Sequence, residues 1–364
     1  MQSRLNHQHQ CHRCRRKIKK ANSCQARLKK PARRKKKARM IRMSNATVAG
    51  FNYLHGAAES SLYRNGKVML RRDADGNDHD IQGLMQARHQ MPVQDARDAE
   101  NLRASLAQNG FELIDSPLDA GAIDFFDQQS VLQHYYPQCE RIVQAVSGGR
   151  AFAFDHNVRS AREKQVGRRI AGGQQVQEPL QLVHGDYTLT SAPQRLRDLA
   201  NPPSLNDTLR RVLADGESLI SKPLMHQALG EGGRFAIINV WRSIAPEPVA
   251  RLPLALCDAQ SVRPKDLVVF ELHYQDRIGE NYFAKHAARH RWFHYPAMSR
   301  DEALLIKQWD CAGAMARSNG EQADADHPQA PSTFSFHSAF DHPETARDAP
   351  DRQSIEVRCM VIYD

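Results

Sequence analysis

No run of apolar residues in this 364-residue chain approaches the roughly 18–20 residues that a membrane-spanning helix needs. The longest apolar stretches, such as Phe235–Val240 and Leu267–Leu272, have the length of strands. No internal repeat is visible, and the composition lacks the glycine or cysteine excess of a collagen or of a disulfide-stapled miniprotein. A hydrophobic fraction of 41% instead indicates a folded chain with a sizeable core.

Acidic residues are missing from residues 1–42, which hold 17 Lys and Arg. The whole chain has 51 basic and 41 acidic residues, so the other 322 residues hold 34 basic against 41 acidic side chains. The formal charge of +10 therefore comes from the N-terminal segment, and the body is acidic. Because a nucleic-acid-binding domain carries its basic excess on a folded surface, the body argues against a nucleic-acid partner.

Residues 1–42 also contain few large apolar side chains, so we expect a disordered basic tail. The tail is a localisation or RNA-binding arm, an organelle transit peptide, or upstream DNA translated ahead of a true start at Met43. Cys11 and Cys14 form a CxxC in it, but only Cys24 follows, whereas a structural zinc site needs a second ligand pair.

The cysteines of the body show no pairing pattern, and no signal peptide is apparent. We therefore expect a reducing, cytoplasmic setting, with a nuclear or organellar location only if the basic tail is genuine. No membrane association is expected, and no feature of the sequence bears on the oligomeric state. These four cysteines are Cys139, Cys257, Cys311 and Cys359.

The organisation changes at Gly148-Gly149. Residues 43–150 form a mixed α+β segment that includes a helix over Ser130–Val146, and we expect this segment to pack on the domain that follows. In residues 151–364, short strand-like runs recur between Pro, Gly and Asp, which is typical of a β-sandwich or barrel. The runs are Ala151–Asp155, Leu180–Tyr187, Phe235–Trp241, Leu252–Cys257, Leu267–Tyr274, Arg291–Tyr295, Leu304–Trp309, Thr333–Phe336 and Ser354–Tyr363.

The strongest local signal for chemistry is the run Val183-His184-Gly185-Asp186-Tyr187-Thr188. In an extended strand, residues i and i+2 point to one face, so His184 and Asp186 offer a nitrogen and an oxygen to one point. A third ligand from another strand would complete a two-His-one-carboxylate triad, which suits non-haem Fe(II). On the motif alone, local hydrogen bonding is the plainer explanation for such a pair.

Position narrows the choice of a third ligand. In a jelly roll, the HxD strand and a late strand lie beside each other at one mouth of the barrel. Phe334–His337 is the penultimate strand run, which favours His337, although a satisfied core histidine is an equal alternative. The other candidates are His156, His226, His273, His286, His290, His294, His327 and His342.

Arg358 stands in an otherwise apolar last strand, where an unpaired charge is costly. Its partner is either Glu356, two residues away on the same face, or the distal carboxylate of a bound 2-oxo acid. Arg242 ends another strand and either grips a carboxylate or stacks on a ring. The aromatic run His290–Tyr295 is either core packing or the lining of an apolar pocket.

These pieces occur in an order that resembles a family of non-haem iron oxygenase-like proteins. The family includes cephamycin hydroxylase-type proteins, fungal hydroxylase/desaturase proteins, a gibberellin desaturase and a meroterpenoid endoperoxidase. The resemblance covers roughly residues 60–364. It is carried by FDHNVR at 154–159, VHGDYT at 183–188, NVWRSI at 239–244, PLALCD at 253–258, HRWFHYPAM at 290–298, LLIKQWD at 304–310, FHSAFDHP at 336–343 and SIEVR at 354–358.

The resemblance implies a mainly β fold, a double-stranded β-helix (jelly roll, cupin-like) with flanking helices. It also implies the use of Fe(II), 2-oxoglutarate and O₂. Carried over by position, His184, Asp186 and His337 are expected to be the iron ligands. The basic tail is not part of the family pattern.

The resemblance further implies an arginine that anchors 2-oxoglutarate. We expect Arg358, with Arg352 and Arg242 as weaker candidates. Arg347 has the spacing of many related oxygenases but lies in a loop rich in Pro and Asp. Candidates for the substrate pocket are Tyr187, Asn239, Trp241, His290 and Trp292.

The implied reaction is the hydroxylation or desaturation of a small secondary metabolite, with decarboxylation of 2-oxoglutarate to succinate. The alternative is a non-catalytic or accessory member of the family, associated with a methyltransferase. A dinucleotide-type glycine loop would favour that alternative, but the nearest candidate, Gly230–Gly233, lacks a strand–loop–helix context.

Overall fold

The computed structural model describes residues 46–72, 78–98, 104–118, 123–173, 175–204, 207–274 and 278–364. The chain divides into two compact units, Met1–Arg42 and Met43–Asp364, and all described residues belong to the second. The predictions for the basic tail, the Met43 start and the Cys11–Cys14 motif therefore lie outside the described residues.

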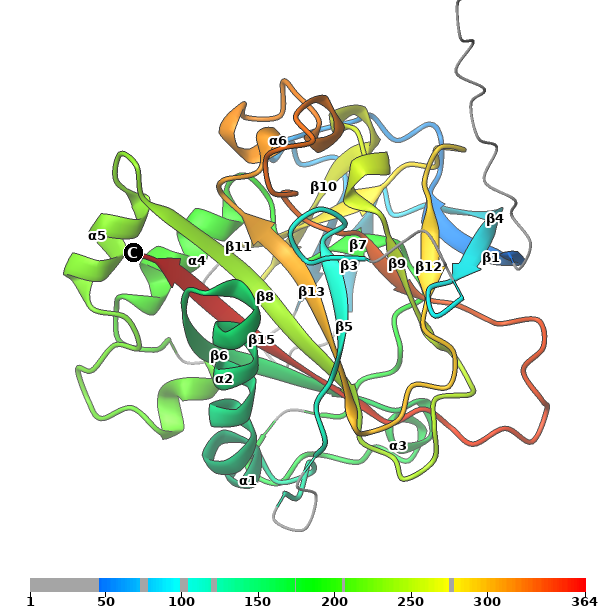
Figure 1. Ribbon diagram of the computed structural model, residues 1–364, viewed down its shortest axis with the longest axis horizontal. Helices are drawn as coiled ribbons and strands as arrows, with labels where there is room; N and C mark the ends of the chain where they lie inside the picture. The colour runs from blue at the N-terminus through cyan, green and yellow to red at the C-terminus, as the bar shows by residue number, and fades with distance from the viewer. Residues whose placement is uncertain are drawn as a thin grey trace, which may run out of the picture. The chain divides into compact units, whose positions relative to one another are not determined.

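Two β-sheets form the framework of the second unit (Figure 1). The larger has ten strands in the order β1-β4-β12-β9-β14-β7-β11-β10-β2-β3. Its strands are β1 (Ala46–Leu54), β2 (Met69–Arg72), β3 (Asp78–Gln82), β4 (Gln86–Asp95), β7 (His184–Gly185), β9 (Leu254–Cys257), β10 (Leu267–His273), β11 (Ile278–Ala284), β12 (Trp292–His294) and β14 (His337–Ala339).

The smaller sheet has five strands in the order β5-β13-β8-β15-β6, and every neighbouring pair is antiparallel. The C-terminal strand β15 is an inner strand between β8 and β6, which agrees with the long apolar alternation of that segment. The strands are β5 (Phe111–Asp115), β6 (Arg150–Arg159), β8 (Arg234–Ser243), β13 (Glu302–Asp310) and β15 (Ser354–Tyr363).

An apolar cluster joins the facing sides of the two sheets. Trp241 of β8 and Ile306 of β13 pack in it with Leu256 of β9 and Phe293 of β12. Because side chains alternate along a strand, these residues mark the inner face of each strand. The inner faces therefore enclose the interior of the jelly roll.

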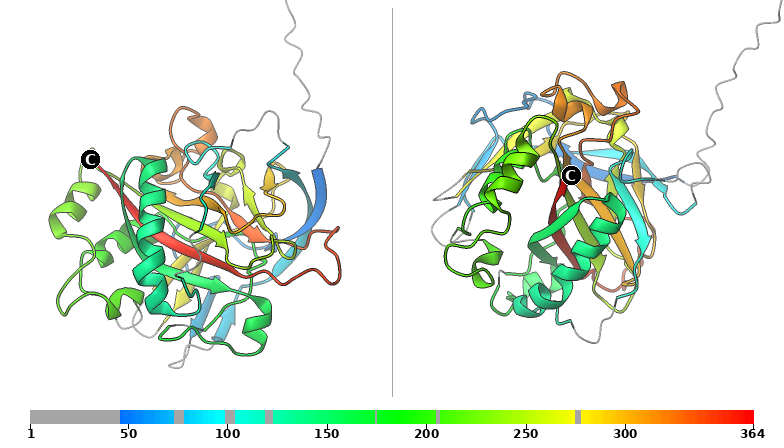
Figure 2. Two further views of the ribbon diagram at one scale, coloured as in Figure 1. Left: turned by 60° about the horizontal axis from the view of Figure 1, so that its bottom comes forward. Right: turned by 60° about the vertical axis from the view of Figure 1, so that its left-hand side comes forward.

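Helix α2 (Tyr136–Ser147) lies across the outer face of the five-stranded sheet (Figure 2). Its Cys139 and Val143 share a buried cluster with Val357 and Cys359 of β15. The helix ends at Gly148, whose φ of 75° is the left-handed conformation that glycine adopts most easily. The helix predicted over Ser130–Val146 is confirmed by this segment.

The other helices are short and lie outside the sheets. The α-helices are α1 (Gln128–Ser130), α3 (Ala161–Gln165), α4 (Ser191–Leu199), α5 (Lys222–Leu229) and α6 (Ala314–Arg317). The π-turn is η2 (Val131–Tyr135), and the 3₁₀ turns are η3 (Thr208–Arg211), η4 (Ala259–Ser261), η5 (Pro264–Asp266) and η6 (Asp324–Asp326).

The ten-stranded sheet curls back on itself. Asn52 of β1 forms a parallel bridge with Leu182, two residues before β7, and Leu54 bridges Lys285. Strand β1 therefore closes against the centre of its own sheet, although β1 and β7 are far apart in the strand order.

Several predicted elements are wrong in their extent. The run predicted over Leu180–Tyr187 contains only the two-residue strand β7, and the strand predicted over Thr333–Phe336 begins after that run, at His337. Strand β11 lies outside every predicted run. The strands β7, β11 and β14 are neighbours, so the sequence was least informative where the sheet is most irregular.

Among the described residues, no helix has both the length and the apolar character needed to cross a bilayer.

Candidate metal centre

The starts of strands β7 and β14 bring two histidines face to face. His184 and His337 are direct partners in the antiparallel ladder, so their side chains point to the same side of the sheet. Asp186 follows two residues after His184 and reaches the same point. Leu256 also pairs with His337 and packs against the five-stranded sheet, so this side is the interior of the jelly roll.

Three acceptor atoms of these side chains face one another. Nε2 of His184 lies 3.6 Å from Oδ1 of Asp186, and Nε2 of His337 lies 3.9 Å from the same oxygen. One ligand atom of each residue lies within 4.8 Å of the other two. Both nitrogen–oxygen distances are too long for hydrogen bonds, so no shared proton joins the three atoms.

The tautomer of His184 follows from its backbone contact. Its Nδ1 lies 2.7 Å from the carbonyl oxygen of Leu182. A carbonyl oxygen only accepts, so Nδ1 carries the proton and Nε2 is left as the acceptor that faces Asp186. An imidazole oriented in this way by a backbone carbonyl is typical of metal-binding histidines.

Burial sets the charge of the three groups. Burial and the neighbouring imidazole of His337 lower the pKa of His184 to about 3. Burial also lowers the pKa of His337. For Asp186, burial acts to raise the pKa, but the charge of Arg358 helps to hold it well below its usual range. Two neutral imidazoles and one carboxylate are the protonation states that a divalent cation requires.

These residues fit a divalent metal. Three buried acceptors that converge without a proton between them repel one another unless a cation lies among them. Two imidazoles and one carboxylate on one side of the ion leave the opposite side open, which is the donor set of non-haem Fe(II) oxygenases. The fit rests on His184, Asp186 and His337 alone.

The second oxygen of Asp186 faces away from the two histidines and is held by the protein. Nε of Arg358 lies 3.3 Å from Oδ2, and Nδ2 of Asn239 lies 3.1 Å from it. Nη1 of Arg358 also donates to Asp155 at 3.0 Å, and Nδ2 of Asn239 donates to Glu356 at 2.6 Å. Arg358 therefore reaches the centre, but carboxylates of the protein already surround its guanidinium.

A second group of polar side chains lies further along the same inner face. Ser354 of β15 pairs with Arg159 of β6, and Arg352 precedes Ser354 by two residues. Nε of Arg352 and Oγ of Ser354 are buried and have no hydrogen-bond partner among the described residues. Burial and the nearby charge of Arg159 lower the pKa of Arg352 to about 9. Nη1 of Arg352 donates to the carbonyl of Leu252 at 2.5 Å, and its Nε is left unused. Two adjacent cations beside the unused donors of Arg352 and Ser354 are typical of an anion-binding corner.

Arg242 does not lie with this group. It pairs with Ile355, so it points to the outer face of the five-stranded sheet. Its guanidinium is fully buried and donates to the hydroxyl of Tyr135, to the carbonyl and hydroxyl oxygens of Ser116, and to the carbonyl of Arg300. The strand alternation, which the sequence already displays, separates Arg242 from Asn239 and from the metal-facing side.

Three of the predicted pocket residues lie near the centre. Asn239 bonds to Asp186, and Trp241 lies on the same inner face with the guanidinium of Arg352 5.5 Å from its ring centre. Tyr187 follows Asp186 directly. Burial raises the pKa of Tyr187 to about 12.

The other two predicted pocket residues lie on the opposite face of the larger sheet. Phe293 shares the inner face with Leu256 and His337, so its neighbour Trp292 points the other way. There the indole of Trp292 donates to the hydroxyl of Tyr53, which is hydrogen-bonded to His290. His290 and Trp292 therefore belong to a buried network away from the metal centre.

Sequence reasoning did not single out four polar residues of the inner face: Asp155, Arg159, Gln308 and Ser354. Asp155 and Arg159 lie in FDHNVR, so this motif carried a signal that was not interpreted residue by residue. The position of Gln308 had no sequence signal, because it depends on a β-bulge in β13 between Lys307 and Trp309.

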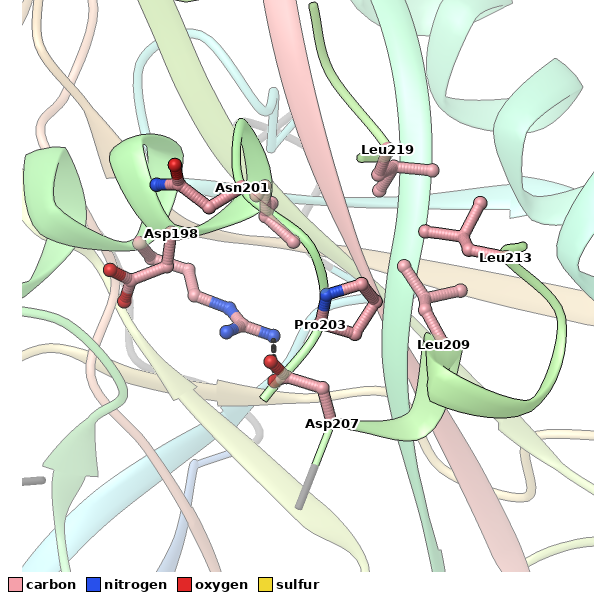
Figure 3. Close-up of a pocket in the computed structure, with 9 residues that line it drawn as sticks. Asp198, Asn201, Pro203, Asp207, Leu209, Leu213 and Leu219 are labelled. Atoms are coloured by element: carbon pink, nitrogen blue, oxygen red, sulfur yellow. Dashed lines mark ion pairs between the residues drawn. The ribbon is translucent and has the colours of Figure 1, made fainter. Parts of the chain in front are cut away.

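A small cavity lies beside α4, with an ion pair at its edge (Figure 3). Nη2 of Arg195 lies 2.9 Å from Oδ1 of Asp207, and Leu209, Leu213 and Leu219 lie across the cavity from α4 (Figure 3). Its volume of about 10 Å³ has room for one water molecule at most. This cavity is too small for an organic substrate.

The amino-acid sequence is similar to those of known proteins. The chain matches the family model described as oxidoreductase/YMDC permease-like domain over residues 51–362. It is 42% identical over 209 residues to an uncharacterised protein in the dcmA 3′ region of Methylophilus leisingeri, which covers 57% of this chain and 94% of that protein. It is 26% identical over 286 residues to the hydroxylase/desaturase efuI of Hormonema carpetanum, which covers 75% of this chain and 83% of that protein.

A solved structure shares the fold. The iron and alpha-ketoglutarate-dependent endoperoxidase NvfI matches with a TM-score of 0.61 and 21% identity, over 87% of this chain and 98% of that one. The mainly β jelly roll with flanking helices that the sequence predicted is therefore confirmed. The resemblance to hydroxylase/desaturase and endoperoxidase proteins is confirmed as well.

Proposed function

The chain belongs to the oxidoreductase/YMDC permease-like domain family, and from this premise we propose that it is an Fe(II)- and 2-oxoglutarate-dependent oxygenase. Its substrate is a small molecule of the secondary-metabolite type, which it hydroxylates or desaturates. The observation that carries the proposal is the meeting of Nε2 of His184, Nε2 of His337 and Oδ1 of Asp186 within 4.8 Å. The similarity to a hydroxylase/desaturase supports the same chemistry.

In this proposal the three convergent side chains hold the iron. His184 and His337 give neutral nitrogen ligands, and Asp186 gives one negative charge. Bound there, Fe(II) supplies the coordination of the keto acid and O₂ and the oxidation of a substrate C–H bond. The two sheets on either side of the centre keep bulk water away from it, since each of the three side chains is less than one-tenth exposed.

We assign the anchor of the cosubstrate to the corner formed by Arg352, Ser354 and Arg159. The sequence favoured Arg358, but that guanidinium already faces Asp186 and Asp155. By contrast, the unused donors of Arg352 and Ser354 suit a carboxylate that arrives with the cosubstrate.

The charges on the inner face favour the binding of a dianion. Three arginines and three acidic side chains lie along this face, so their formal charges are equal in number. The arginines are Arg159, Arg352 and Arg358, and the acids are Asp155, Asp186 and Glu356. Because burial raises the pKa of Glu356, these acids balance the arginines at most, and a divalent cation at the three ligands leaves a surplus of at least two positive charges. The two carboxylates of 2-oxoglutarate neutralise that surplus, as a buried site requires.

The substrate itself is proposed to meet Asn239 and Trp241 on the inner face and Tyr187, which follows Asp186. The acidic body gives no support to a nucleic-acid partner. The cytoplasm remains the proposed location, supported by free thiols at Cys139, Cys257 and Cys359, all of which are buried.

Anaerobic titration with Fe(II) and 2-oxoglutarate tests this function. A keto acid that chelates Fe(II) through two oxygens gives a weak visible absorption band. We expect the band in the wild-type protein and in His226→Ala, a control whose imidazole is exposed on α5, and its loss in His184→Ala. A folded, iron-supplied wild-type protein without the band would favour the accessory-protein alternative.

A further inference from the structure

We propose that Arg358, Asn239 and Gln308 lock Asp186 in a geometry in which only Oδ1 can reach the metal. The inference rests on the proposed function and deepens it. The three residues are positioning residues, since they act through Asp186. Their role is to keep Asp186 a one-oxygen ligand and thereby to preserve the number of open positions on the metal.

The two oxygens of Asp186 have separate surroundings. Oδ1 faces the two imidazoles at 3.6 and 3.9 Å. Oδ2 accepts from Nε of Arg358 at 3.3 Å and from Nδ2 of Asn239 at 3.1 Å. A rotation of the carboxylate that brought Oδ2 to the metal would break both contacts, which are charge-assisted, and the one to Arg358 is also an ion pair.

The two donors are themselves fixed. Arg358 and Asn239 are direct partners across β15 and β8, so they approach Oδ2 from neighbouring strands. Nη1 of Arg358 donates to Asp155 at 3.0 Å, and its Nη2 lies 3.7 Å from Glu356. Glu356 also accepts from Nδ2 of Asn239 at 2.6 Å. Each side chain therefore has a second acidic partner that prevents it from following Asp186.

Gln308 fixes the backbone of the same ligand. Strand β7 ends at Gly185, so no ladder hydrogen bond of β7 holds Asp186. Its N–H instead donates to Oε1 of Gln308 at 3.1 Å. Gln308 is fully buried and occupies the bulge in β13, and a bulge re-aims a side chain at the point where it occurs. The irregularity of β13 thus compensates for the early end of β7.

The number of coordination positions explains why one oxygen matters. Three single-atom ligands leave three positions of an octahedral ion open. A keto acid bound through two oxygens takes two of them, and the third is needed for O₂. If Asp186 bound through both oxygens, only two positions would remain, and the cosubstrate and O₂ would compete. The lock therefore allows both reactants to bind at once.

The test uses the full chain loaded with Mn(II), a redox-stable probe that takes oxygen and nitrogen ligands. Water-proton relaxation counts the exchangeable waters on the ion, and calorimetry gives its affinity. We expect three waters in the wild-type protein. In Arg358→Gln and Asn239→Leu we expect fewer waters or an affinity lower by about 10–100-fold, the usual effect of removing an outer-shell partner.

Two further variants separate the possible results. Arg358→Lys keeps the charge but cannot span Asp186 and Asp155, so we expect it to behave like Arg358→Gln. Arg352→Gln is the matched control, since it should weaken 2-oxoglutarate binding and leave the Mn(II) affinity and the water count unchanged. If Arg358→Gln does not fold, Gln308→Leu and Asn239→Leu carry the test.

The outcomes distinguish the two proposals. A wild-type protein that binds no Mn(II) overturns the proposed function itself. In the other outcome, the wild-type protein binds Mn(II), and folded variants of Arg358, Asn239 and Gln308 bind it with the same affinity and water count. That result overturns the proposed positioning role of these residues and leaves the metal centre intact.

Discussion

The contacts of individual side chains determine the role that each arginine of this protein can have. The sequence predicted that Glu356 and Arg358 share a face of the last strand, and the structure has them 3.7 Å apart at their closest charged atoms. It could not predict that Asp155 and Asp186 converge on the same guanidinium, because both belong to other segments of the chain. The proposed reassignment of the anchor from Arg358 to Arg352 rests on these long-range contacts and on the unused donors of Arg352 and Ser354.

For the proposed metal ligands, too, local spacing was readable from the sequence and long-range contacts were not. The spacing of His184 and Asp186 predicted a shared face, which needs only local geometry. The sequence favoured His337 among nine histidines from its place in a late strand run and from the family resemblance. The pairing of β14 with β7, which brings it opposite His184, is a property of the sheet. Arg242, in contrast, could have been excluded from the sequence by counting its position from Asn239 along the strand.

A buried histidine outside the metal centre gives a pH prediction at this scale. His294 is 4% exposed, and burial and the nearby His342 lower its pKa to about 4. Asp95 acts in the opposite direction, and Arg97 adds to the lowering. Between about pH 4 and pH 6.5 the unfolded chain therefore binds a proton at this residue that the folded protein does not.

The free energy of unfolding should accordingly fall as the pH drops through that window. We expect His294→Phe to reduce this pH dependence by about 1.4 kcal/mol per pH unit at most, the value for one proton. Urea unfolding between pH 4.5 and 7 measures it, with His226→Phe as the exposed control. Equal slopes for wild type and His294→Phe would show that the imidazole does not titrate in this window.

At the scale of elements, the sequence predicted the long regular strands well and the short strands poorly. Strands β8 and β15 have ten residues each, and their apolar runs predicted them well. Strand β11 was missed, because its run Ile-Gly-Glu-Asn-Tyr-Phe-Ala mixes glycine and polar residues. Yet β11 pairs with β7 and fixes the position of His184. The elements that build the centre are thus among the least regular in the chain.

Close packing around β7 leads to a prediction for Gly185, the residue between the two proposed ligands. A Cβ atom there would lie 3.1 and 3.2 Å from ring atoms of Phe334. Phe334 is 1% exposed and stacks near Tyr282 and Trp309, so it has little room to move. We expect Gly185→Ala to lower the free energy of unfolding by roughly 1–3 kcal/mol, the usual cost of overpacking.

A second substitution tests the cause. Phe334→Leu makes room for the new methyl group, so the double variant should be more stable than the sum of the two single losses predicts. Urea unfolding of the four proteins gives the coupling free energy. Strictly additive losses would mean that Gly185 is required for a reason other than its contact with Phe334.

At the scale of the whole molecule, segments from the entire described chain contribute to one interior. Strands β1 and β4 pair within the larger sheet, and β5 pairs with β13 in the smaller one, although all three precede residue 150. The division into an α+β segment at 43–150 and a core at 151–364 remains a prediction. The charge separation between a basic N-terminal segment and an acidic body was readable from composition, because it needs no knowledge of contacts.

The central claim is that one metal ion binds at the meeting point of β7 and β14 and that 2-oxoglutarate binds beside it. Anomalous diffraction at the iron edge, from crystals prepared without oxygen in Fe(II) and 2-oxoglutarate, tests this claim most directly. We expect a single strong peak bonded to His184, Asp186 and His337, with the distal carboxylate of 2-oxoglutarate on Arg352 and Ser354. Well-ordered crystals with these side chains in place and no peak among them, or a peak elsewhere, would contradict the account.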